Sequence, residues 1–202
     1  MTAAEAAARI TENFSGAITG EKEFRGETSL TLDAAALHGI CSFAKESLGF
    51  DYLVDISAVD HFGEEPRFEV VYELYSMGHA VHLRLKIPVS EDNCEAQTIS
   101  DIWPTADWHE REVYDLMGIG FRNHPDLRRI LMWVGYPYHP LRKDFPLEGK
   151  PSDAPELAFS DAAPLAGGPF VTVPTDGTTQ VREPRARHAG EVPRPEKFIE
   201  EP

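Results

Sequence analysis

Arginine and carboxylate side chains that could do chemistry are concentrated between residues 108 and 145, where they alternate with aromatic residues. An arginine fork binds a carboxylate through two parallel hydrogen bonds and stacks on aromatic rings, and such pairs are enriched in specific protein interfaces. The same pairs can form an internal network, and the sequence leaves both interpretations open because it does not show burial. The residues concerned are Glu110, Arg111, Asp115, Asp126, Arg128, Arg129, Arg142 and Asp144.

The 8 histidines could bind a metal ion only if their spacing brought several ligands together. His79 and His82 differ by an odd number of positions along a predicted hairpin, so they point to opposite faces. His109 and Glu110 begin the pattern of a zinc-protease helix, but Val113 stands where the second histidine is required. A stand-alone metal-dependent enzyme is therefore a remote alternative.

Signatures of nucleophilic catalysis and nucleotide binding are absent, since no GxSxG, GxGxxG or GK[ST] pattern occurs. Cys94 lies among acidic residues, which raise the pKa of a thiol and so oppose its activation. Cys41 lies on the apolar stripe of a predicted helix, as a small core residue does. We therefore predict no catalytic, cofactor-binding or metal-binding residue in this chain.

The composition predicts one core in an acidic chain, because 42% of the 202 residues are hydrophobic and the formal net charge is −15. Nucleic acid and anionic membranes require a cationic surface, so neither is expected as the main partner. Residues 111–150 alone are net basic, with 7 basic against 5 acidic side chains. No apolar run approaches the about 20 residues of a transmembrane helix, so no direct membrane span is expected.

The N-terminal elements that carry this composition follow from short local signals. Thr2 and Glu5 predict a capping box for a helix that runs to about Asn13, and a polar loop is expected from there to Glu27. Residues 28–32 predict a short strand. A second helix follows it, with an apolar stripe of Leu37, Ile40, Cys41, Ala44 and Leu48 between a cap at Asp33 and an end at Gly49.

Three strands with a period of two are predicted next. The first places Tyr52, Val54, Ile56 and Ala58 on one face, and the other two form a hairpin over residues 68–75 and 80–87. With Tyr75 opposite Ala80, the predicted register sets Glu73 opposite His82 and Glu69 opposite Lys86, and it keeps the apolar residues on the inner face.

Two helices are predicted before the arginine-rich segment. The first spans residues 99–103 and stops at Pro104, and the second begins after a cap at Thr105 and ends at Met117, with Gly118 at its close. Glu110 falls on the apolar face of the second helix, at helical spacing from Val113, Tyr114 and Met117.

The predicted fold class is α+β: a mostly antiparallel sheet with helices on one face, followed by an irregular motif segment and an extended C-terminal tail. The predicted divisions are an N-terminal helix and loop over residues 1–27, an α+β domain over 28–150, and a proline-rich tail over 151–202. The tail holds 9 of the 16 prolines, so it is expected to be extended.

Three motifs at the end of the predicted domain resemble the signature of the 30-kDa subunit of respiratory complex I, the proton-pumping NADH:quinone oxidoreductase. They are ERE-YDL-GI-F at 110–121, HPDLRRIL at 124–131 and HPLRKDFP at 139–146, in matching order and spacing. Tyr138 departs from the pattern, which has glycine before His-Pro. The resemblance implies interface roles for the signature residues Glu110, Arg111, Tyr114, Asp115, His124, Pro125, Asp126, Arg128, Arg129, His139, Arg142, Lys143 and Asp144.

The resemblance further implies a docking subunit of the peripheral arm that supports electron transfer from NADH to quinone. Such a subunit belongs to an enzyme but has no catalytic residue or cofactor of its own. FMN, iron–sulfur clusters and quinone are expected in partner subunits, and the expected neighbours are the 49-kDa-type and iron–sulfur subunits. The absence of an arginine-rich presequence favours the cytoplasmic side of a bacterial inner membrane. The equivalent subunit of a membrane-bound hydrogenase or formate-oxidising complex is the main alternative.

Overall fold

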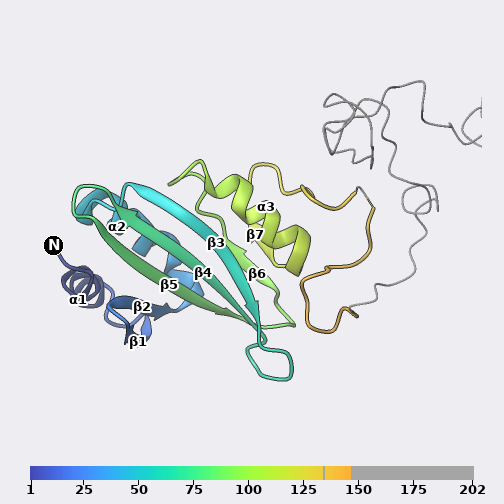
Figure 1. Cartoon of the computed structure of the whole chain (residues 1–202), viewed down its shortest axis with the longest axis horizontal. Helices are drawn as coiled ribbons and strands as arrows, with labels where there is room; N and C mark the ends of the chain where they lie inside the picture. The colour runs from blue at the N-terminus through green and yellow to red at the C-terminus, as the bar shows by residue number, and fades with distance from the viewer. Residues whose placement is uncertain (134, 147–202) are drawn as a thin grey trace, which may run out of the picture. The chain divides into compact units, whose positions relative to one another are not determined.

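The computed structural model describes residues 1–133 and 135–146, and these lie within one compact unit. Two helices and a five-stranded sheet come first along the chain, and a third helix with a small two-stranded sheet follows (Figure 1). The α+β fold class predicted from the sequence is confirmed. The elements are α1 (Ala3–Asn13), β1 (Ile18–Phe24), β2 (Glu27–Leu32), a 3-10 turn (Ala34–Ala36), α2 (Leu37–Leu48), β3 (Tyr52–Asp60), β4 (Phe68–Ser76), β5 (Val81–Val89), β6 (Glu95–Gln97), α3 (Ala106–Met117) and β7 (Gly120–Arg122).

Helix α1 begins with the predicted capping box, because Thr2 accepts the N–H of Glu5 while the Glu5 carboxylate accepts the N–H of Thr2. The polar loop predicted after this helix is wrong, since β1 pairs there with β2 in an antiparallel hairpin. Most β1 side chains are exposed, so the strand has no apolar alternation to reveal it. The sequence signal that remained was Gly26. It lies in the two-residue turn of this hairpin, where Arg25 and Gly26 both have positive φ angles, as tight hairpin turns require.

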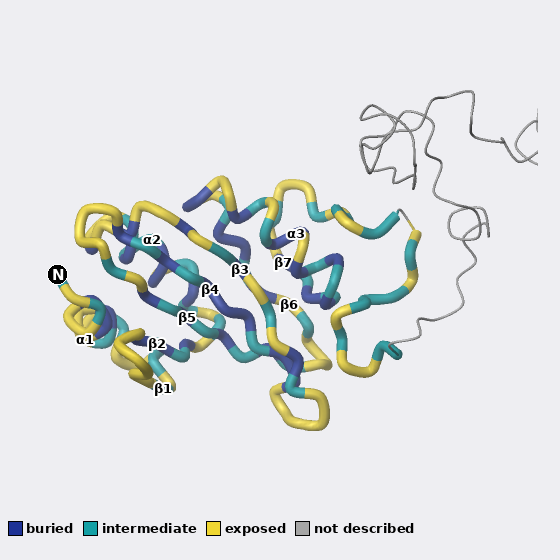
Figure 2. Tube along the Cα trace, in the orientation of Figure 1, coloured by how far each residue is buried: buried dark blue, intermediate teal, exposed yellow. Residues whose placement is uncertain are grey.

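The sheet has the strand order β1-β2-β5-β4-β3, and the β2–β5 pair is its single parallel contact. Helix α2 is drawn behind the strands in Figure 1, and α1 contacts α2, β2 and β5. The predicted stripe of α2 is buried, and it belongs to the same core cluster as the inner faces of β4 and β5. In Figure 2, β4 and β5 are mostly buried or half-buried, whereas β1 is mostly exposed.

The hairpin of β4 and β5 has a different register from the predicted one. Tyr75 lies opposite His82, and Glu73 lies opposite Arg84. Ala80 adopts a left-handed φ of 53°, so it belongs to the turn and not to the strand. The change keeps every apolar side chain on its predicted face, because the pairing moves by an even number of residues.

Strand β3 departs from its predicted face because it contains a bulge. Leu53 lies opposite Leu74 and Asp55 opposite Glu73, which leaves Val54 as the extra residue. A bulge reverses the alternation of a strand. Tyr52 and Val54 are therefore exposed, whereas Leu53 and Ile56 are buried.

The helix predicted over residues 99–103 is wrong, since these residues form a turn in which the N–H groups of Ile102 and Trp103 both donate to the Ile99 carbonyl. Pro104 offers no N–H to extend it. Helix α3 has the predicted bounds and ends at Gly118, which has a left-handed φ of 74°. Thr105 precedes it in a helical conformation and makes no side-chain cap, because a capping residue needs an extended backbone.

Candidate functional site

Helix α3 carries two carboxylates into the interior of the domain. Glu110 and Asp115 are both fully buried, and five positions separate them, which is about 140° around a helix. They therefore face different surroundings. Glu110 faces the turn before the helix, and Asp115 faces the segment after β7.

Asp115 holds residues 129–132 in place with a single side chain. Its Oδ2 accepts the backbone N–H groups of Ile130, Leu131 and Met132 at 3.0, 2.7 and 2.8 Å. Its Oδ1 accepts from Arg129 Nη1 at 2.6 Å. Burial alone would raise the pKa of Asp115, but these four donors outweigh it and the pKa is lowered. The carboxylate thus supplies hydrogen bonds that a partner strand would otherwise provide.

A second segment of the chain, residues 139–144, covers the C-terminus of α3. Arg142 donates from Nε to the Met117 carbonyl at 2.6 Å, and His139 donates from Nδ1 to the Asp115 carbonyl at 2.9 Å. Last-turn carbonyls lack helical partners and carry partial negative charge, so these groups suit them. Gly118 permits the approach, because a Cβ there would lie 2.6 Å from both side chains.

Two residues that the sequence did not single out hold the end of this second segment. Arg67 is buried and donates to both carboxylate oxygens of Asp60 at 3.0 Å, and it forms a further ion pair with Asp144 at 3.1 Å. Asp60 also accepts the backbone N–H of Lys143 at 2.8 Å. The hydrogen bond from Arg67 lowers the pKa of Asp60. Local sequence offered no signal for these contacts, since Asp60 and Lys143 are far apart in the chain.

The arginines of residues 108–146, the motif region, divide into internal and exposed ones. Arg111 is buried, stacks on Trp108 at 5.0 Å and donates to the Arg128 carbonyl. Arg129 is 15% exposed, whereas Arg128 is 71% exposed and, among the described residues, pairs with Asp126. Internal contacts therefore account for Arg111, Arg129 and Arg142. An interface role for the exposed Arg128 stays a prediction.

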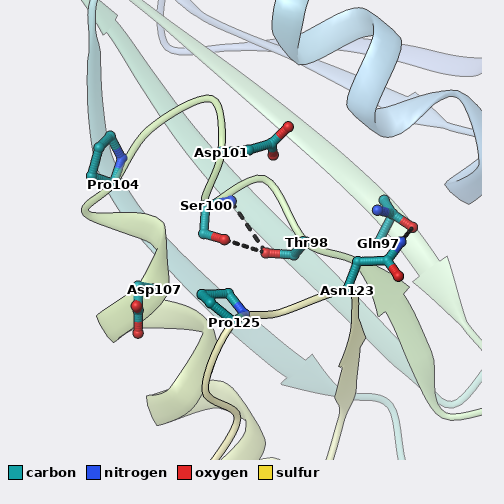
Figure 3. Close-up of a pocket in the computed structure, with 8 residues that line it drawn as sticks. All are labelled: Gln97, Thr98, Ser100, Asp101, Pro104, Asp107, Asn123 and Pro125. Carbon is teal, nitrogen blue, oxygen red and sulfur yellow. Dashed lines mark hydrogen bonds between the residues drawn. The ribbon is translucent and has the colours of Figure 1, made fainter.

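Glu110 lies in a separate polar cluster. Its Oε1 accepts the N–H of Ile99 at 2.8 Å, and its Oε2 accepts the Thr98 hydroxyl at 2.5 Å. His124, whose side chain is fully buried, lies 3.8 Å away. Thr98 also lines a pocket of about 570 Å³ that opens beside the N-terminus of α3 (Figure 3).

The structure brings only part of the predicted site set together. Asp115, Arg129, His139 and Arg142 form one contact group around the end of α3. Tyr114 packs against the core, and Pro125 lines the pocket. The side chains of Asp126 and Lys143 are exposed. Tyr138, which departs from the expected glycine, contacts the rings of Tyr136 and Phe145.

Within residues 1–133 and 135–146, no group of three or more His, Cys, Asp or Glu side chains is arranged to hold a metal ion. No helix in this part of the chain is long and apolar enough to cross a bilayer. Burial raises the pKa of Cys94, in the direction that the sequence predicted, although its acidic neighbours are a smaller cause than burial.

Comparison with known proteins identifies the family of this chain. Residues 30–151 match the model of the respiratory-chain NADH dehydrogenase 30 Kd subunit. The chain belongs to this family. The C subunit of NADH-quinone oxidoreductase from Geobacter metallireducens is 51% identical over 145 residues, which are 70% of this chain and 88% of the relative. The corresponding protein of Geotalea uraniireducens is 49% identical over 144 residues, or 70% and 86% of the two chains. The resemblance inferred from the motifs is confirmed.

Two solved structures share the fold. The trypsin-resistant fragment (1-134) of Nqo5 is 30% identical with a TM-score of 0.54, and the match covers 60% of this chain and 99% of that one. A chain of the membrane-bound sulfane sulfur reductase, an archaeal respiratory membrane complex, is 27% identical with a TM-score of 0.60, covering 71% and 85%. The second structure shows that the fold also occurs in a respiratory membrane complex with a different name.

Proposed function

We propose that this chain is a structural subunit of the peripheral arm of a proton-translocating NADH-quinone oxidoreductase, and that it positions neighbouring subunits without holding a redox group. Relatives about half identical over most of their length are named as the C subunit of NADH-quinone oxidoreductase, and this observation carries the proposal. The 49-kDa-type and iron–sulfur subunits are the proposed neighbours. FMN, iron–sulfur clusters and quinone are assigned to those partners, on the cytoplasmic side of a bacterial inner membrane.

The side chains of the motif region support a structural role. Asp115, Arg129 and Arg142, which would be candidates for chemistry by type, all have their polar atoms engaged with backbone groups of this chain. A catalytic group needs free access to a reacting atom. These contacts instead give an irregular segment a fixed shape, which a docking surface requires.

The outer surface of the same region supports docking. Trp108, Leu131 and Leu141 are all more than half exposed, and they come from α3 and the two segments that fold against it. Arg128 adds an exposed guanidinium group. Large apolar side chains beside an arginine are typical of interface centres.

A related membrane-bound respiratory complex is the second candidate. The likeness to a chain of the sulfane sulfur reductase, with a TM-score of 0.60, favours it because that complex uses the same fold. Its 27% identity is lower than the 51% shared with a relative from an NADH-quinone oxidoreductase. The quinone oxidoreductase therefore remains the first candidate.

Co-purification tests both candidates in one experiment. An affinity-tagged full chain would replace the native copy in its source organism, and detergent-solubilised membranes would be purified through the tag. We expect the other NADH-quinone oxidoreductase subunits in equal amounts, together with NADH:quinone activity and flavin and iron–sulfur absorbance. The tagged chain expressed alone is the control and should be colourless. Subunits of a hydrogenase, formate-oxidising or sulfur-reducing complex in place of these would contradict the proposal.

A further inference from the structure

Glu110 is a buried acid whose environment differs from that of Asp115. It is fully buried on α3 and, within residues 1–133 and 135–146, accepts two hydrogen bonds, from the Ile99 N–H and the Thr98 hydroxyl. Asp115 has four donors, and one of them is an arginine. A buried carboxylate without a cation is costly in its charged form.

Apart from His124, the groups that face Glu110 among the described residues are neutral or acidic. Cys41 approaches from α2 and Tyr72 from β4, and both are neutral at pH 7. Asp107 on its own helix and Asp101 on the preceding turn are acidic and raise its pKa. Within the part of the chain that the structure describes, the one basic group in ion-pair range is His124.

Two backbone groups bind the ring nitrogens of His124. Its Nδ1 accepts the backbone N–H of Asp126 at 3.0 Å, so the ring proton lies on Nε2. That nitrogen is 3.1 Å from the Asp107 carbonyl, to which it donates. The Nδ1 lone pair is thus used by a backbone donor, and Nε2 also lies 3.6 Å from Asp107 Oδ1 and 3.8 Å from Glu110 Oε2.

Two hydroxyl groups connect Glu110 with the pocket. Thr98 Oγ1 lies 2.5 Å from Glu110 Oε2 and 2.9 Å from Ser100 Oγ. Thr98 and Ser100 both line the pocket, and Figure 3 shows their hydroxyls turned toward each other. A hydroxyl can accept one proton while it gives up another, so the pair forms a continuous path from the carboxyl group to solvent.

We propose that Glu110 is a proton-binding site that exchanges its proton with the pocket through Thr98 and Ser100. On release, the proton of Oε2 passes to Thr98 Oγ1, the hydroxyl proton of Thr98 passes to Ser100 Oγ, and that of Ser100 passes to water. Uptake runs in reverse. The neutral acid donates to Thr98, and the carboxylate accepts from it, so the protonation state sets the direction of the hydrogen bond between α3 and the turn before it.

The pH range of this exchange lies near neutrality. Burial raises the pKa of Glu110 to about 7, and the hydrogen bonds from Ile99 and Thr98 oppose that rise. A glutamate in an unfolded chain has a pKa of about 4.3. Between these values the folded chain binds more protons than the unfolded chain, so the stability that depends on Glu110 falls as the pH rises from about 4.3 to about 7.

Carbon-13 NMR of the full chain, labelled in its glutamate side chains, measures this directly. We expect the Glu110 Cδ signal, assigned through bonds in the wild-type protein, to titrate with a midpoint of about 7. A midpoint near about 4.3, the ordinary value for glutamate, would overturn the proposal. No substitution is needed for this measurement, and its outcome does not depend on the proposed respiratory function.

Three variants test the path and the linkage. Thr98→Val removes a donor to the carboxylate and should raise the midpoint, whereas Ser100→Ala should move it less but slow the exchange and broaden the signal. Glu110→Gln should flatten the dependence of stability on pH between about 4.3 and 7, and Glu112→Gln, at an exposed position of the same helix, is the matched control. An unchanged midpoint with Thr98→Val or an unchanged line width with Ser100→Ala would overturn the path. Equal slopes in the two Gln variants would overturn the linkage.

Discussion

The sheet with α1 and α2 and the motif region around α3 are stabilised by different interactions. In the sheet, fully buried side chains share one core cluster with the apolar stripe of α2; they include Tyr72, Leu74, Leu83, Leu85 and Ile87. In the motif region, the residues after β7 form no helix or strand within the described part of the chain. Their backbone is held by Asp115, Arg142 and Asp60 instead.

The difference shows how a segment without secondary structure can have a defined shape. Apolar burial is not directional, so it fixes a fold only together with a sheet or helix whose backbone is already paired. A buried carboxylate is directional, and it satisfies several backbone N–H groups at fixed positions. The motif region depends on few side chains, so the loss of one of them should destabilise the chain about as much as the loss of a core residue.

The largest expected effect is that of Asp115→Ala. Removing the carboxylate leaves Arg129 without its partner and three backbone N–H groups without acceptors. Breaking a buried charged pair from one side costs about 3–5 kcal/mol. Chemical unfolding of the full chain should show a loss of that size, comparable with the about 2–5 kcal/mol expected for a core change such as Leu85→Ala.

Asp126→Ala is the control for this substitution, since Asp126 is exposed and pairs with an exposed arginine. It should change stability by no more than about 0.5 kcal/mol. Hydrogen exchange adds a local measurement, because the amides of residues 130–132 should lose protection in Asp115→Ala before those of β4 and β5. Uniform loss of protection across the domain would mean that the two regions unfold as one unit.

The next effect compares two glycines with the same backbone conformation. Gly49 and Gly118 end α2 and α3, and both have a φ of 74°. An alanine at either position adopts a left-handed conformation at a cost of roughly 1–2 kcal/mol. At Gly118 the new Cβ also meets His139 and Arg142 at 2.6 Å, whereas at Gly49 its nearest neighbour is 3.9 Å away.

Gly118→Ala should therefore cost roughly 1–3 kcal/mol more than Gly49→Ala, the usual range for overpacking. Thermal or chemical unfolding of both variants gives the comparison. Equal losses would show that His139 and Arg142 move aside freely, and that the second segment is held mainly by Asp60 and Arg67.

Local signals predicted much of the sheet region and few of its irregularities. The capping box, the stripe of α2 and the inner face of the hairpin all depend on spacing within one element, so they could be read from the sequence. The bulge at Val54, the left-handed Ala80 and the strand β1 depend on backbone pairing with neighbours. Alternation of residue types does not record such pairing, which is why these features were missed.

In the motif region, the important residues could be identified from the sequence, but their contacts could not. Its residues were recognised from type and spacing, but sequence could not tell an internal network from an interface, because that depends on burial. Asp60 and Lys143 are in contact although they lie 83 positions apart in the chain, and no periodicity of the sequence connects them. The predictions on residues 151–202 lie outside the described residues. The predicted division into three parts stays a prediction, although α1 shares the core of the sheet.

The smallest expected change in stability is that of Arg128, in contrast with the adjacent Arg129. Arg129 donates to the carboxylate and the carbonyl of Asp115, and hydrogen bonds to charged groups contribute about 1.5–3 kcal/mol each. Arg128 pairs at the surface with Asp126, and such pairs contribute about 0–1 kcal/mol. Arg129→Gln should therefore destabilise the isolated chain, and Arg128→Gln should leave its unfolding midpoint almost unchanged.

Assembly should reverse this order if Arg128 faces a partner subunit. Arg128→Glu would then abolish co-purification of the neighbouring subunits while the isolated variant melts normally. Arg9→Glu, an exposed arginine on α1, is the matched control and should assemble. Native gels of membranes beside thermal melts of the purified chains supply both measurements. If Arg128→Glu assembles as well as Arg9→Glu, the motif region would serve only to shape the domain, and the docking surface would have to lie elsewhere on it.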